Sequence, residues 1–165
     1  MTEMAIPMSA GEMAEILDEL GVMSGLVADA MRRIPRSQWT QRAANGDFSL
    51  VEHVCHLRDI EAEGYVVRLR RMLREVEPVL ADIDGGRLAI ERNYQAQDAG
   101  AAFQAFAEAR AESIAILEAA SDEDLQRTAR FAGADLITMS CLAEMILSHD
   151  RAHRREIEEL VAEFT

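Results

Sequence analysis

The sequence predicts an all-α fold: a four-helix bundle with one long crossover connection between its second and third helices. Composition is the first reason, because the 165 residues include only 9 Gly and 3 Pro, while strong helix formers such as Ala, Glu, Leu and Arg dominate. The second reason is that apolar residues recur with helical spacing in four long segments. With 49% hydrophobic residues, the chain is long enough for a full core, and we expect residues 1–165 to form one domain.

The four expected helices have recognisable boundary signals. They span about residues 9–34, 47 or 49 to 75, 98–120 and 138–163. Pro35 follows the first helix and Pro78 follows the second, and either Asp47 or Ser49 is a suitable N-cap for the second. Lengths of roughly 22 to 28 residues are typical of helices in bundles.

The connection between the second and third helices is too long for a tight turn. It reads EVEPVLADIDGGRLAIERNYQAQD, residues 75–98, with a Gly-Gly pair in its middle. A segment of this length suits a crossover that returns the chain to the other end of the bundle. A second extended connection, residues 121–137, precedes the last helix.

The charge of the chain excludes several classes of function. A net charge of −13 argues against binding the phosphate backbone of nucleic acid or an anionic membrane surface. All 17 basic residues are arginine. Without lysine, the chain contains no group for Schiff-base chemistry, a pyridoxal anchor or a phosphate-loop lysine.

The two cysteines and the N-terminus predict a cytoplasmic protein. Cys55 and Cys141 lie in apolar helical runs, where each is expected to be a free thiol acting as a small buried hydrophobe. The first residues are acidic and interrupted by Pro7, unlike a secretory signal peptide. No apolar run approaches the length of a membrane span.

The four histidines form two pairs, one on each of two expected helices. They are His53 with His56, and His149 with His153. On the last helix, the core-facing stripe contains Leu142, Ile146, His149, His153, Ile157 and Leu160. Burying an imidazole there without a partner would cost about 1–3 kcal/mol. Something inside the bundle must therefore satisfy these side chains.

A metal held between facing helices is the partner that two such pairs favour. One His pair at i, i+4 is a weak motif, since a carboxylate, a carbonyl or water often satisfies buried histidine. Two pairs on separate helices point instead to a metal. Helical periodicity on the second helix, where Val54 and Leu57 mark the buried side, selects His53 as the third ligand. With either His53 or His56, the result is a three-histidine site with open positions.

Three stretches then carry a resemblance to a known family. They are GDFSLVEHVCHLRDIEAEG in the second helix, ERNYQAQD before the third, and LITMSCLAEMILSHDRAHRREI in the last. The chain resembles the DinB/YfiT-like superfamily, four-helix bundles related to the bacillithiol and mycothiol S-transferases. Members typically show an aromatic residue, then Ser or Thr, then a His-Leu pair, and later H-x-x-x-H. Phe48-Ser49 stands at the first of these positions, with Phe in place of the commoner Trp.

The resemblance assigns the ligands differently from periodicity. It implies His56, His149 and His153 as metal ligands, which makes His53 a supporting or pocket-lining residue. It also implies an up-down-down-up bundle, a homodimer, and a divalent metal, Zn or Ni first, with Fe and Mn as alternatives. Ligating histidines usually donate their second N–H to an acceptor, and Glu52, Asp59 and Asp150 are the candidates, although acids at such positions are more often solvated.

Two functions follow from this sequence. The first is a metal-dependent enzyme, a thiol S-transferase or hydrolase acting on a small electrophile, with a low-molecular-weight thiol or water as nucleophile. The second is a dimerising bundle of a stress response that binds metal or a small ligand without turnover. No general base beyond the metal ligands is recognisable in the sequence.

Overall fold

Four long helices form the body of the molecule in the computed structural model, which describes residues 7–133 and 135–165. The first, third and fourth are α1 (Ala10–Arg33), α5 (Ala99–Ala119) and α7 (Met139–Phe164). The second consists of α2 (Leu50–Asp59), a π-helical turn (Ile60–Tyr65) and α3 (Val66–Arg74). The predicted helical bundle is therefore confirmed, with boundaries within a few residues of those expected.

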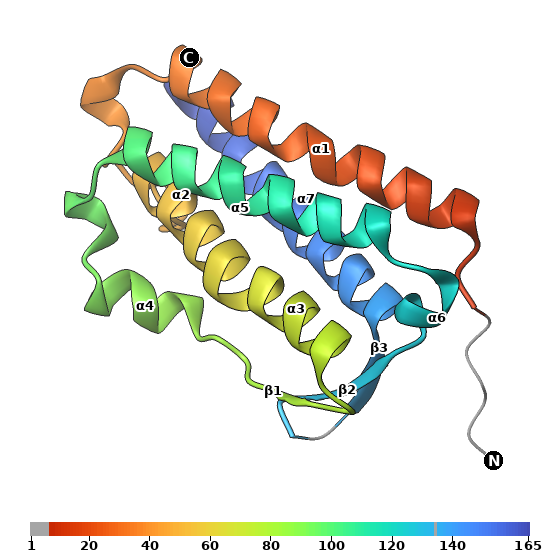
Figure 1. Ribbon diagram of the computed structural model, residues 1–165. Coiled ribbons are helices and arrows are strands. Elements are labelled where there is room, and N and C mark those ends of the chain that lie inside the picture. Colours follow the sequence, from red (N-terminus) through yellow and green to blue (C-terminus); the bar gives the residue numbers. More distant parts are fainter. Residues whose placement is uncertain (1–6, 134) are drawn as a thin grey trace.

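The helices run up, down, down and up along the chain (Figure 1). The continuous helix α2–α3 and the next long helix, α5, point in the same direction, so the chain between them must cross from one end of the bundle to the other. α1 packs against α5 and α7, and α2 packs against both as well. As a result, α2 and α7 lie side by side and antiparallel, with their side chains facing each other.

Side-chain caps set where the helices begin. Ser9 and Ser49 each accept a hydrogen bond from a backbone N–H three residues later, and Glu12 and Glu52 bond back to the cap, forming two capping boxes. Ser49 is thus the N-cap of the second helix, so the alternative start at Asp47 is wrong. Thr138 caps α7 in a similar way.

A small three-stranded sheet, which the sequence did not predict, joins the two long connections. β1 (Val79–Leu80) runs parallel to β2 (Thr128–Phe131), which pairs antiparallel with β3 (Asp135–Thr138). Strands of two to four residues are too short for a visible alternation of apolar and polar residues. The crossover also contains α4 (Gly85–Glu91) and a 3₁₀ turn (Tyr94–Ala96), whereas α6 (Asp122–Leu125) precedes β2. The sheet closes one end of the bundle (Figure 1).

The core fills the interior along the whole length of the bundle. One half centres on Val54, Leu57 and Phe106, and the other on Leu20, Leu69 and Leu142. Among residues 7–133 and 135–165, no helix combines the length and the apolar character that crossing a membrane requires.

Candidate metal centre

All four histidines meet where α2 faces α7. His56 Nε2 lies 3.0 Å from His149 Nε2. One ring nitrogen from each of His56, His149 and His153 lies within 4.8 Å of the other two. The structure therefore brings the three predicted ligands together from two helices, although His56 and His149 are 93 positions apart in the chain.

Burial keeps these imidazoles uncharged. His53 is fully buried, His56 is 8% exposed, and His149 and His153 are partly buried. Loss of hydration, followed by the neighbouring histidines, lowers the pKa of His53 and His56 to about 3 and of His149 to about 2. Burial lowers the pKa of His153 to about 4. At neutral pH each imidazole therefore has an unprotonated nitrogen, the form that binds metals.

The three residues fit a divalent transition metal. The Nε2 atom of His56 points at His149. Its other ring nitrogen, Nδ1, is buried and has no hydrogen-bond partner among the described residues. Three neutral imidazoles from one side leave positions open on the other, as in zinc sites that carry out reactions. Metal ligation would satisfy nitrogens that are otherwise crowded together.

The open side of the three histidines faces a cavity of about 440 Å³. Its apolar walls come from Phe48, Ile60, Tyr65, Ile83, Phe131 and Met145. Its cationic side chain is Arg68, which donates a hydrogen bond to the carbonyl oxygen of Ala81 and stacks on the rings of Tyr65 and Phe131. Sequence reasoning missed Arg68, because one of the two rings that it stacks on, Phe131, lies in the sheet that was not predicted.

Comparison with known proteins places this arrangement in a family. The sequence profile of the DinB superfamily matches residues 10–157, which include all four histidines. The chain belongs to the DinB superfamily.

Among solved structures, this DinB-superfamily chain is similar to YfiT from Bacillus subtilis, described as a probable metal-dependent hydrolase with an unusual four-helix bundle topology. The TM-score is 0.87 at 18% sequence identity, over 98% of this chain and 92% of YfiT. At this identity the similarity confirms the fold. Comparison with curated protein sequences gave no match.

Gly85 is a close neighbour of the site in this DinB-superfamily chain. A Cβ atom at this position would lie 2.4 Å from Cε1 and 2.6 Å from Nδ1 of His56. These distances are shorter than any non-bonded contact, so only glycine lets α4 begin against the imidazole. Gly85, and not Gly86, therefore packs directly against the His56 ring.

We expect Gly85→Ala to lower metal affinity at least about tenfold, because the added methyl group would displace the His56 ring. Mutating residues that orient a metal ligand typically has an effect of this size. Gly86→Ala is the matched control, because its Cβ would meet Asp84 at an ordinary 3.5 Å. Competition titration of both variants with a chelator measures the effect. Equal metal affinities of the two variants would show that the crossover can shift to accommodate the methyl group and does not position His56.

His53 belongs to a second group on the other side of His153. Its Nδ1 lies 3.2 Å from Nδ1 of His153. Glu156 joins them, with its carboxylate 3.3 Å from Nδ1 of His153 and 3.6 Å from Nε2 of His53. His56 thus lies with both members of the H-x-x-x-H pair, whereas His53, the residue chosen by periodicity, lies with His153 and Glu156. Glu156 was missed, although it stands three positions after His153 on one helix.

The three acids proposed to orient the ligands do something else. Glu52, Asp59 and Asp150 are buried, so the expectation of solvated surface acids is wrong. Their partners are arginines: Glu52 pairs with Arg42, Asp59 with Arg58 and Arg92, and Asp150 with Arg110. Within residues 7–133 and 135–165, none of these carboxylates accepts a hydrogen bond from a histidine. The acceptor that lies beside the histidines is Glu156.

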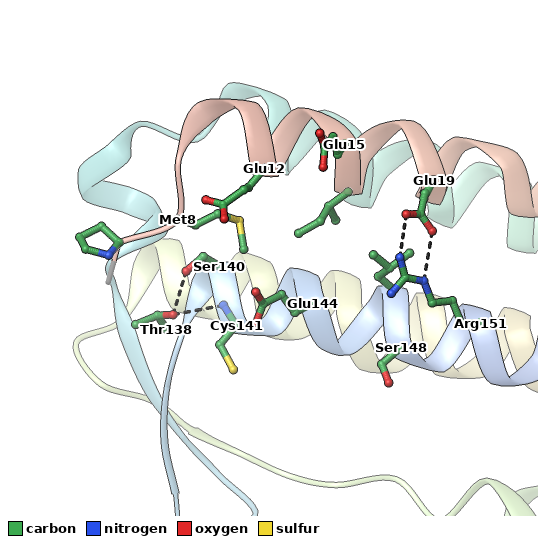
Figure 2. A pocket seen from close by; sticks show the side chains of 13 residues that line it. Met8, Glu12, Glu15, Glu19, Thr138, Ser140, Cys141, Glu144, Ser148 and Arg151 are labelled. Carbon is green, nitrogen blue, oxygen red and sulfur yellow. Dashed lines mark hydrogen bonds and ion pairs between the residues drawn. The ribbon is translucent and has the colours of Figure 1, made fainter. Parts of the chain in front are cut away.

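A larger groove, of about 700 Å³, lies elsewhere, between α1 and α7 (Figure 2). Its lining is acidic, with Glu12, Glu15, Glu19 and Glu144, and the pair Glu19–Arg151 bridges the two helices. Cys141 lines it half-buried, and burial raises the pKa of its thiol. Because none of its lining residues is a histidine, this groove is separate from the metal centre. Cys55 is also free and is fully buried, as predicted.

Proposed function

We propose that this protein is a metal-dependent enzyme that uses His56, His149 and His153 to hold a divalent transition metal. It acts as a hydrolase or a thiol S-transferase on a small electrophile. The convergence of three neutral imidazoles at one wall of a 440 Å³ cavity carries this proposal. Zn and Ni are the first candidates, followed by Fe and Mn, because imidazole accepts all of them.

The metal would supply Lewis acidity, which activates water or a thiol as nucleophile and polarises the electrophile. The chain supplies the surroundings. Phe48 and Met145 supply apolar walls beside the three histidines. Burial raises the pKa of Tyr65 to about 12, so its hydroxyl stays protonated and keeps its ring neutral beside His149.

Arg68 gives the cavity a preference for substrates that carry negative charge. Its guanidinium donates to the carbonyl oxygen of Ala81 and lies 4.0 Å from the exposed carboxylate of Asp82, which also lines the cavity. The guanidinium stays at the cavity wall beside the rings of Tyr65 and Phe131. An arginine held in this way can receive a carboxylate or a similar group. A small electrophile or thiol with an acidic group fits these features best.

Turnover by metal-loaded protein tests the proposal. An aryl halide, an epoxide and an activated ester would each be incubated with the protein, with and without a low-molecular-weight thiol. We expect turnover that His149→Ala lowers at least about 100-fold, since a Lewis acid contributes several kcal/mol. Ser148→Ala, a neighbouring exposed residue, should leave the rate unchanged.

Dependence on the thiol distinguishes the two chemistries: a rate that needs thiol indicates transfer, and a rate without it indicates hydrolysis. The second candidate function is a bundle that binds metal without turnover. Rates equal to those in buffer, with every substrate and with metal bound, would refute catalysis in favour of this second function.

A further inference from the structure

The group formed by His53, His153 and Glu156 has the composition of a metal site. One ligand atom from each residue lies within 4.8 Å of the other two. The residues come from α2 and α7, the same two rigid helices that carry the three-histidine group. Two imidazoles and one carboxylate are ligands that Zn, Fe, Mn and Co all accept.

His53 is the observation that points to a ligand. Its side chain has no exposed surface, and its Nε2 has no hydrogen-bond partner among the described residues. The Glu156 carboxylate lies 3.6 Å from this nitrogen, just beyond hydrogen-bond distance. Leaving such a buried nitrogen unsatisfied has a free-energy cost. A cation between His53 and Glu156 would remove this cost.

Negative charge gathers on the same side. Glu156 is half-buried, and the carboxylate of Asp47 lines the same surface hollow. A divalent cation bound to Glu156 would compensate these charges.

The group has its own opening to solvent. A hollow of about 300 Å³ is lined by Arg42, Gly46, Asp47, Phe48, His153 and Glu156. Phe48 and His153 also line the 440 Å³ cavity on the other side. The ring of Phe48 stands edge-on to His53 and to His56, with centroids 5.6 Å apart in each case. Phe48 therefore separates two entrances to the histidines.

We propose that His53, His153 and Glu156 form a second divalent-metal site, which shares His153 with the three-histidine site. The sharing uses opposite ring nitrogens. Nδ1 of His153 faces His53 and Glu156. The nitrogen left for His56 and His149 is therefore Nε2.

The tautomer of His153 makes the two sites alternatives. A neutral imidazole has one nitrogen with a free lone pair and one that carries hydrogen. With metal at the three histidines, Nδ1 of His153 carries the hydrogen and faces His53 and Glu156. With metal at the second site, Nδ1 is the ligand and Nε2 carries the hydrogen. One metal ion per chain is expected at neutral pH, at one site or the other. This inference does not require the three-histidine site to be catalytic.

Cobalt binding to a variant without the first site tests the inference. The double replacement His56→Ala with His149→Ala removes two of the three histidine ligands and leaves the second group intact. We expect this variant to bind about one equivalent of Co²⁺ with a visible d–d spectrum. Adding Glu156→Gln or His53→Phe should then weaken binding at least about tenfold. Glu159→Gln, an exposed acid one turn along the same helix, is the control.

Two outcomes would overturn the second site. One is a double variant that binds no Co²⁺ at millimolar metal. The other is binding that Glu156→Gln and Glu159→Gln change equally. Circular dichroism checks the fold, and leucine in place of both alanines provides a second background if the alanine pair unfolds. Wild-type stoichiometry is measured in parallel, so a failure of the three-histidine site is seen separately.

Discussion

Replacing His56, His149 and His153 together by alanine is expected to abolish binding of a divalent transition metal. The wild-type chain, purified without an affinity tag, should carry close to one equivalent. The triple variant should carry none, because it removes all three ligands of the first site and the shared ligand of the second. Elemental analysis by inductively coupled plasma mass spectrometry measures both.

The physical reason for so large an effect is that the site is built before metal arrives. Its imidazoles are already neutral at pH 7, so no proton has to be displaced from a ligand. One ring nitrogen of each histidine already lies within 4.8 Å of the other two, on two packed helices. Metal binding therefore does not have to drive folding of the site or deprotonation of its ligands.

A matched control is the triple replacement of Ser148, Arg154 and Arg155 by alanine, which changes three exposed residues of the same helix. It should bind metal as the wild type does. Absence of metal from the wild-type chain, even after anaerobic reconstitution, would falsify the ligand assignment. The histidines would then be hydrogen-bonded polar residues of the core.

The long helices and the histidine group were predictable from sequence, because both depend on local spacing. Ser9 and Ser49 are followed three positions later by glutamate, a pattern that marks helix starts without reference to the rest of the chain. His149 and His153 stand four apart within an apolar stripe. The long connection needed no pairing information, since its length alone implied a crossover.

Features that depend on distant partners were not predictable in this way. The sheet pairs Val79 with Arg130, about fifty positions away. The pairing uses backbone hydrogen bonds, which do not depend on residue type. The contact of Gly85 with His56 depends on where α4 begins. Helical periodicity could not separate His53 from His56, because nearly every residue of α2 is buried, including both of these histidines.

Arg110 is the clearest example of a feature hidden from sequence. It lies in an alanine-rich helix whose arginines would ordinarily face water, yet it is 2% exposed. Its guanidinium donates two hydrogen bonds to Glu61 and two to Asp150, which are 49 and 40 positions away, respectively. It also donates to the carbonyl of Leu20. One side chain therefore links all four bundle helices, next to His149.

We expect Arg110→Met to lower the free energy of unfolding by about 3–5 kcal/mol, because it leaves two buried carboxylates without their cation. For a chain of this size the melting temperature should fall by roughly 6–20 °C. Thermal unfolding followed by circular dichroism measures the change. Arg70→Met, which breaks the surface pair with Glu112, should cost less than about 1 kcal/mol.

Neutralising the carboxylates should recover much of the loss. Arg110→Met combined with Glu61→Gln and Asp150→Asn removes the uncompensated charges, while Arg110→Met alone retains them. If Arg110→Met costs no more than Arg70→Met, the buried pairs do not hold the four helices together. If the neutralised variant is as unstable as the single one, the cost is one of packing and not of charge.

The pH dependence of the difference between wild type and Arg110→Met separates charge from packing. Burial raises the pKa of Asp150, and the hydrogen bonds of Arg110 oppose that rise. Without Arg110 the pKa must rise further. A carboxyl whose folded-state pKa is raised stabilises the fold at low pH, and that contribution is lost as pH rises through the folded-state pKa. The cost of Arg110→Met should therefore be largest near pH 7 to 8 and shrink towards pH 4. A packing defect would instead leave the difference constant with pH.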